Sequence, residues 1–218
     1  MRWVTRVLAV LGLVLGATGQ AGAVAITVVN PGFEVPPELD GTFTTTPNAA
    51  TGWTHDGTAG VWNPSPTQAY GGVAPEGSNV AYSNSGPLSQ ILTTLLAANT
   101  TYTLTVQVGD RGDTAFPGYQ VQLLAGSTVL AQCNTCVTPA DNTFTLATVT
   151  FTTPSSVTTD LLGIRLDSNG EQTNFDDVRL NASPADPVPE PGTLFLFGAG
   201  LAGIGVLRGR RWFKGAGD

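Results

Sequence analysis

The chain has 218 residues and a formal net charge of −7, and only 11% of its residues are charged, whereas an average globular domain carries about 25%. The pI of about 4.5 excludes a basic surface for nucleic acid, so we expect no nucleic-acid partner. One His and two Cys leave little for a histidine-based triad or a zinc site. With 27 Gly and 15 Pro, the composition is typical of strands and turns and disfavours most enzyme classes.

The N-terminus has the layout of a secretory signal peptide. Arg2 and Arg6 precede an apolar run at 7–15, and small residues follow up to Ala23. A membrane anchor is the alternative, but this run is shorter than the roughly 20 apolar residues that a spanning helix needs. We therefore expect residues 1–23 to be a cleaved signal peptide.

Residues 24–181 are predicted to form one domain of β-strands. Apolar and polar side chains alternate strictly over 101–108, which predicts a half-buried antiparallel strand. Two short runs around a turn predict a hairpin over 119–131. We expect further strands at 25–29, 79–83, 88–92, 143–152, 161–166 and 175–180. Because no soluble helix is evident, the fold class predicted is all-β, an antiparallel β-sandwich of the jelly-roll type.

One expected strand, at 143–152, carries an irregular pattern. Phe144 and Leu146 are in one alternation phase, whereas Ala147 and Val149 are in the other. The change of phase indicates a β-bulge, or else a strand that is buried on both faces.

The C-terminal segment has three parts in a fixed order. A linker at 182–187, rich in prolines and small residues, is expected to be extended. Pro189-Glu190-Pro191 then precedes an apolar run, and a cluster of arginines follows the run. A helix over 193–207 is about 22 Å long, so it spans a hydrocarbon core of roughly 30 Å only marginally.

This order at 188–214 resembles the PEP-CTERM protein-sorting signal of Gram-negative bacteria, which is also catalogued as the ice-binding protein C-terminal domain. The resemblance implies an exosortase as partner, with cleavage at or near Pro189, Glu190 and Pro191. It also implies transient anchoring in the inner membrane by the transmembrane helix at 193–207. The final location is then outside the cell, at the cell surface or in an exopolysaccharide matrix.

Several landmarks within the domain resemble those of galactose-binding-like jelly rolls, which include many carbohydrate-binding modules. They are Asn30-Pro31-Gly32-Phe33-Glu34, Gly52-Trp53, Gly77-Ser78-Asn79-Val80-Ala81-Tyr82 and Asn174-Phe175-Asp176-Asp177-Val178-Arg179-Leu180. The resemblance implies a structural calcium ion where the first segment meets the last strand. Glu34 and Asp176 are the ligands that this resemblance nominates.

Asp176 is also notable for its expected orientation. Val178 and Leu180 take the inward face of the last strand, so alternation places Asp176 inward as well. A buried carboxylate needs a partner. Calcium is one such partner, and the alternatives are backbone N–H donors or an arginine.

The two cysteines, Cys133 and Cys136, are three positions apart. A zinc site lacks a second pair of ligands, and thioredoxin-like redox chemistry lacks its βαβ context. In an exported protein we therefore expect a disulfide that fixes the loop before the strand at 143–152.

Aromatic residues in the loop-rich first half are candidates for stacking on sugar rings. We select Trp62, Trp53 and Tyr70 as carbohydrate-binding residues, although core packing is the alternative for each, and we expect Trp62 to be the most exposed. Arg111-Gly112-Asp113 spells an integrin motif, which we attribute to chance in a bacterial-looking protein.

The function predicted from these features is that of an exported, non-catalytic module in the extracellular matrix that binds a neutral polysaccharide. Its 13 acidic residues against three basic ones favour neutral or cationic partners. A purely structural matrix protein is the alternative, followed by a polysaccharide hydrolase. A hydrolase requires two placed carboxylates, and no spacing nominates a pair.

Overall fold

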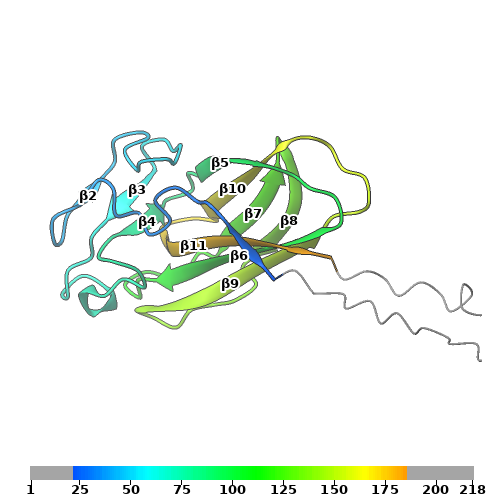
Figure 1. The fold of residues 1–218 in the computed structure, drawn as a ribbon. Helices are drawn as coiled ribbons and strands as arrows, with labels where there is room; N and C mark the ends of the chain where they lie inside the picture. The colour runs from blue at the N-terminus through cyan, green and yellow to red at the C-terminus, as the bar shows by residue number, and fades with distance from the viewer. Residues whose placement is uncertain (1–21, 186–218) are drawn as a thin grey trace, which may run out of the picture. The chain divides into compact units, whose positions relative to one another are not determined.

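The computed structural model describes residues 22–185, and these residues form an almost wholly β structure (Figure 1). The one helical element is a short 3-10 turn, η1, at Tyr70–Gly72. The strands are β1 (Val24–Ile26), β2 (Phe43–Thr44), β3 (Ala59–Trp62), β4 (Val80–Ser83), β5 (Leu88–Leu95), β6 (Thr100–Asp110), β7 (Tyr119–Ala125), β8 (Thr128–Asn134), β9 (Thr143–Thr152), β10 (Leu161–Ser168) and β11 (Thr173–Pro184).

The strands form two antiparallel sheets that pack face to face. The seven-stranded sheet has the order β2-β3-β4-β11-β6-β9, with β1 paired to the outer part of β11. The four-stranded sheet has the order β5-β10-β7-β8. The chain therefore folds as the antiparallel β-sandwich that its alternating pattern predicted.

The main core lies between the two sheets, and strict alternation explains its composition. In β6 the inward residues Tyr102, Leu104 and Val106 are buried, and the threonines between them face outward. Val121 and Leu123 of β7 meet them from the other sheet. Burying each such side chain contributes about 1.5–3 kcal/mol, which makes this layer the main source of stability.

A second, smaller hydrophobic cluster covers the outer face of the seven-stranded sheet. In β4, Ala81 belongs to the main core, whereas Val80 and Tyr82 belong to the second cluster, because successive side chains point to opposite faces. Trp62 and Tyr70 complete the aromatic part of this cluster, which the segment between β3 and β4 covers. This outer layer positions the candidate site.

Two details of the strands differ from the prediction. The sequence pattern missed β2 and β3, and β3 is buried along its whole length, so it shows no polar alternation. The predicted bulge in β9 is wrong, since its register with β6 is continuous from Thr143 to Thr152. The phase changes because Phe144 faces outward and packs on Tyr70, at 4.4 Å between ring centroids.

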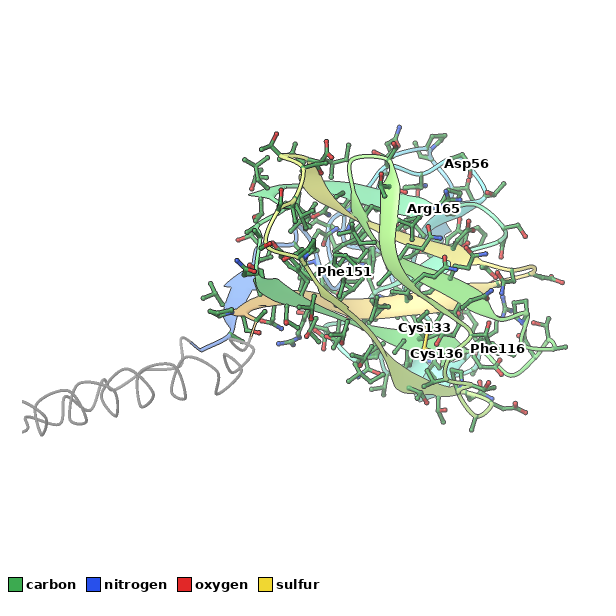
Figure 2. The ribbon with its side chains drawn as sticks, turned by 90° about the vertical axis from the view of Figure 1, so that its right-hand side faces the viewer. Asp56, Phe116, Cys133, Cys136, Phe151 and Arg165 are labelled. Atoms are coloured by element: carbon green, nitrogen blue, oxygen red, sulfur yellow. A yellow bond between two sulfur atoms is a disulfide. The ribbon has the colours of Figure 1, made fainter. Side chains whose placement is uncertain are left out.

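A disulfide joins Cys133 and Cys136 at the end of β8, close to Phe116 (Figure 2). The hydroxyl of the buried Tyr119 lies 3.3 Å from the Cys133 sulfur and accepts a hydrogen bond from the backbone N–H of Val137. The disulfide and Tyr119 together hold the start of the loop that leads to β9.

The predicted signal peptide, the Pro189-Glu190-Pro191 motif and the predicted helix at 193–207 lie outside the described residues. Within residues 22–185, no helix is both long and apolar enough to cross a membrane.

Candidate functional site

A pocket of about 500 Å³ opens on the outer face of the seven-stranded sheet. Trp62 of β3 and Tyr82 of β4 form its floor, and β2 forms one wall. It is lined by Phe43, Thr45, Gly57, Trp62, Thr67, Gln68, Tyr82, Asn84, Arg111, Asp113 and Gln172. The pocket thus combines three aromatic rings with amides, hydroxyls and one pair of opposite charges.

The short strand β2 pairs with β3 and contacts Tyr82 of β4. The Tyr82 hydroxyl donates a hydrogen bond to the Thr44 carbonyl at 2.9 Å, and the Phe43 ring packs edge-on against Tyr82. Gly60 lies beneath this contact, and a Cβ atom there would come within 2.0 Å of the Thr44 carbonyl oxygen. A glycine at position 60 is therefore required for β2 to form the pocket wall.

Charged groups enter the pocket from the loop that follows β6. The Arg111 guanidinium lies 5.5 Å from the centre of the Trp62 ring, which is a cation–π contact. Arg111 also forms an ion pair with Asp113 and donates a hydrogen bond to the Gln172 side chain. Asp113 is the one carboxylate among the described residues that line this pocket.

A buried polar pair supports the floor of the pocket. The Tyr70 hydroxyl donates a hydrogen bond of 2.8 Å to Asn174 Oδ1, and the Asn174 amide in turn donates to the Ala81 carbonyl. Burial raises the pKa of Tyr70 well above its usual value, and nearby Asp110 raises it further. Tyr70 is therefore a neutral hydrogen-bond donor that fixes the aromatic floor.

The three predicted sugar-stacking residues have different locations. Trp62 lines the pocket, but it is only 5% exposed because Arg111 covers its ring, so the expectation of an exposed Trp62 was wrong. Trp53 belongs to the main core, where its ring packs on Phe33, and it cannot stack on a ligand. Tyr70 lies in the second cluster and does not line the pocket.

Sequence reasoning missed most of the pocket. Phe43 was not considered, and Tyr82 was an aromatic candidate that was not selected, although alternation in β4 could have placed it outward. Arg111 and Asp113 were visible only as a chance motif, but they form the charged part of the site. No local spacing connects these residues with Gln172, so only the fold brings them together.

The two carboxylates nominated for calcium hold the same loop. Glu34 Oε1 accepts hydrogen bonds from the backbone N–H groups of Ser78 and Asn79. The fully buried Asp176 accepts hydrogen bonds from the N–H groups of Glu76 and Asp177. Asp176 is thus buried and has protein donors, which was one of the alternatives to calcium. The prediction that it shares the core face with Val178 and Leu180 was wrong. The register with β6 shifts between Asp176 and Arg179, so Asp176 lies opposite Gln107 on the outer face of the sheet.

The groups that shift the pKa of Asp176 include no cationic side chain. Burial raises its pKa to about 8, and the charges of Glu76 and Asp177 act in the same direction. Over residues 22–185, no group of three or more His, Cys, Asp or Glu side chains is arranged to hold a metal ion. Backbone carbonyls would therefore have to supply most of the ligands of any ion there.

Comparison with known proteins identifies the class of this β-sandwich. Residues 24–181 match the family model HpiC1-like, described as HpiC1 cyclase, and residues 187–211 match the PEP-CTERM protein-sorting motif. The chain belongs to the HpiC1-like cyclase family. The predicted sorting signal is thereby confirmed, and it implies exosortase-sorted export to the cell surface of a Gram-negative bacterium.

Solved structures support the same assignment. A Stig cyclase, FisC from Fischerella sp. TAU, in complex with (3Z)-3-(1-methyl-2-pyrrolidinylidene)-3H-indole, is 34% identical with a TM-score of 0.69. The match covers 76% of this chain and all of that chain. The apo form of a Fischerella sp. cyclase is 33% identical with a TM-score of 0.68, and the match covers 76% and 98% of the two chains. No curated protein matches.

Carbohydrate-binding modules, which the sequence also resembled, are among the matched structures. TmCBM61 in complex with β-1,4-galactotriose is 17% identical with a TM-score of 0.43, and the match covers 71% of this chain and 97% of that one. The prediction that the protein is not an enzyme is contradicted, because the chain belongs to a cyclase family and matches Stig cyclases, which are enzymes. The composition did not indicate enzymatic activity, because the pocket-lining residues in the described part of the chain include no histidine, cysteine or metal-binding cluster.

Proposed function

We propose that the domain is an exported cyclase that binds a small, planar aromatic substrate in the outer-face pocket. The observation that carries this proposal is the pocket itself, in which Trp62, Tyr82 and Phe43 surround a space of about 500 Å³. Such a volume accommodates a small molecule. The Fischerella enzymes supply the substrate class, since two of their structures contain indole compounds.

The ion pair in the pocket supplies the polar part of the proposed chemistry. Ring closure on an aromatic nucleus passes through charged states, and fixed charges in a pocket stabilise such states. The Asp113 carboxylate, held by Arg111, is placed to stabilise a positive charge or to accept a proton from the substrate. Gln172 holds the guanidinium on its other side and so orients the pair.

Phe43→Ala is expected to weaken binding of 4-(1H-indol-3-yl)butan-2-one, the ligand of one Fischerella structure, about tenfold. The reason is that Phe43 is 62% exposed and forms the rim of the pocket, so its removal takes away an aromatic contact and little stability. Isothermal titration calorimetry with the purified protein measures the change. Val73→Ala is the matched control, because Val73 is 68% exposed and lies outside the pocket. Equal affinities of the two variants would contradict the assignment of the site.

A neutral glycan is the second candidate ligand, and the amide side chains of the pocket favour it. Gln68, Asn84 and Gln172 can donate to and accept from sugar hydroxyls, while Phe43 offers an exposed ring. A polysaccharide pull-down with wild-type protein and Phe43→Ala separates the two candidates. Glycan retention that depends on Phe43, together with no indole binding, would replace the first proposal by the second.

We propose further that the precursor is anchored transiently in the inner membrane before an exosortase cleaves it. Replacing Pro189, Glu190 and Pro191 by alanine is expected to leave nearly all the protein uncleaved in the membrane fraction, because the recognition motif is lost. Cell fractionation and immunoblotting measure the distribution. Pro184→Ala, outside the matched motif, serves as the control. Normal release of the triple variant would refute exosortase processing at this motif.

A structural calcium ion at Glu34 and Asp176 remains our proposal for the cofactor. The feature in its favour is the buried carboxylate of Asp176. Its pKa is raised by two acidic neighbours, and no cationic side chain is among the groups that shift it. Oxygen ligands suit Ca²⁺ in an extracellular setting. Such an ion would connect the segment before β2 to β11 and would do no chemistry in the pocket, because neither residue lines it.

A further inference from the structure

The outer face of the four-stranded sheet is divided into an apolar half and a polar half. The strand register places the residues of one apolar row side by side across all four strands, namely Ile91, Gly163, Leu124 and Val129. Leu95 and Leu161 pair with each other beyond this row. Ile91 is 77% exposed and Leu95 is 52% exposed. We call Ile91, Leu95, Leu124, Val129 and Leu161 the apolar patch.

The next row of the same face is polar. Ser89, Arg165, Gln122 and Gln132 are neighbours in the register, and Figure 2 labels Arg165. The Gln122 amide donates a hydrogen bond to Gln132, and Arg165 forms an ion pair with Asp167, so these side chains have partners within the sheet. The apolar patch has none, and contiguous exposed apolar side chains mark a site for a protein partner or a membrane.

The apolar patch lies at the end of the domain where the chain continues toward the sorting signal. Leu95 of the patch lines a groove of about 630 Å³ together with Val24 of β1 and Pro184 of β11. Pro184 is the last residue of β11, and the matched sorting motif begins at residue 187. An extended chain from position 184 to the start of the predicted helix at 193 is about 30 Å long. This end of the domain therefore stays within about that distance of the bilayer while the precursor is anchored.

We propose that the apolar patch docks on the surface of a zwitterionic lipid bilayer while the precursor is anchored, an inference that rests on the anchoring proposed above. Residues 24–181 contain 13 acidic and three basic residues, so an anionic surface repels the domain, whereas the patch itself carries no charge. The exposed Asp160 directly precedes Leu161. Because burying a carboxylate is costly, Asp160 keeps the contact at the level of the headgroups, where lipid ammonium groups can pair with it.

Docking by this face leaves the candidate site accessible. The apolar patch is on the outer face of the four-stranded sheet, whereas the pocket opens on the outer face of the seven-stranded sheet, on the other side of the sandwich. No residue of the patch lines the pocket. The inference is therefore independent of the proposed ligand.

A fluorescent label in the patch tests the docking directly. Both native cysteines are paired with each other, so Ile91→Cys adds the one free thiol for an environment-sensitive dye. The labelled full-length protein is reconstituted in phosphatidylcholine vesicles that contain lipid-linked quenchers. We expect the label to lose roughly half of its fluorescence, because an interfacial side chain lies within about the outer 5–10 Å of the bilayer. Glu171→Cys is the matched control, since Glu171 is exposed in the loop at the other end of β10 from Leu161, and its label should stay unquenched.

A charge in the patch provides the second test. Val129→Glu, added to the labelled Ile91→Cys protein, is expected to reduce the quenching at position 91 at least about threefold, because a carboxylate opposes transfer into the apolar part of the interface. Gln132→Glu lies on the same strand in the polar half and should leave the quenching unchanged. Circular dichroism checks that both variants are folded.

Flotation of the vesicles in a density gradient separates the docking from the anchoring. A protein that floats, but whose labels at positions 91 and 171 are quenched equally or not at all, retains its anchor and refutes the docking. A protein that does not float refutes both proposals. A blue-shifted label at position 91 that the lipid-linked quenchers do not reach would show that protein covers the patch, and this outcome also refutes a lipid partner.

Discussion

Replacing Asp176 by asparagine is expected to remove most of the pH dependence of stability between about pH 4 and pH 8. Burial raises the pKa of Asp176 to about 8, although the N–H groups of Glu76 and Asp177 oppose this rise. The folded state therefore binds a proton that the unfolded state releases near the ordinary pKa of 3.8. The stability contributed by Asp176 is full below about pH 4 and is lost as the pH rises through about 8.

The expected loss is large. At about 1.4 kcal/mol for each pH unit between the two pKa values, it amounts to roughly 6 kcal/mol at most. Urea unfolding in EDTA at pH 5, 7 and 9 measures it, with a falling free energy of unfolding for the wild type and a nearly constant one for Asp176→Asn. Asp160→Asn is the control, because Asp160 is exposed and is not among the groups that shift the pKa of Asp176, so the slope should stay unchanged. Parallel slopes for the wild type and Asp176→Asn would contradict this assignment.

The same experiment tests the calcium proposal separately. A cation that binds only the folded state at 100 times its dissociation constant adds about 2.7 kcal/mol of stability. Calcium is therefore expected to raise the wild-type melting temperature at pH 8 and to have little effect on Asp176→Asn. If EDTA and calcium give the same wild-type melting curve, Asp176 is satisfied by its backbone donors alone.

Replacing Trp53 by alanine is expected to lower the free energy of unfolding by about 3–5 kcal/mol. The side chain is 2% exposed, its ring centroid lies 5.1 Å from that of Phe33, and its Nε1–H donates a hydrogen bond to the Asn30 carbonyl. Removing the ring leaves a cavity in the main core and takes away one of the two hydrogen bonds that the Asn30 carbonyl accepts, the other being from the Phe33 N–H. Denaturant unfolding at constant pH measures the change.

The control for Trp53→Ala is the pocket variant Phe43→Ala, which should cost less than about 1 kcal/mol because Phe43 is largely exposed. The two variants therefore separate stability from recognition, since one unfolds the protein more easily and the other weakens the ligand. A Trp53→Ala protein of wild-type stability that fails to bind ligand would show that Trp53 belongs to a binding site after all.

The strands that were predicted well are those whose signal is local. β6 alternates over residues 101–108 because one face meets the core and the other faces outward, so its sequence shows the period of two. The same rule failed for Asp176, because the register shift between Asp176 and Arg179 moves this residue to the opposite face from Val178. β3 is buried on both faces by the added outer layer, so its residues show no alternation, and β2 has only two residues.

The candidate site was predicted much less well, because it is assembled from distant segments. Trp62 was nominated from its position among turns, but Arg111 approaches it only through the fold. Trp53 and Tyr70 were equally aromatic candidates, and their burial separated them from Trp62. A sequence shows that an aromatic ring is present, whereas the packing decides which atoms remain in contact with a ligand.

The sequence by itself determined the antiparallel β-sandwich, the disulfide loop and the C-terminal sorting signal. Each of these depends on periodicity, short spacing or the order of a contiguous motif. Only the tertiary structure decided that a loop and the two-residue strand β2 cover the outer face of one sheet and enclose the pocket. The physical reason is that Phe43, Tyr82 and Gln172 become neighbours through sheet pairing and side-chain packing, which act between residues far apart in the chain.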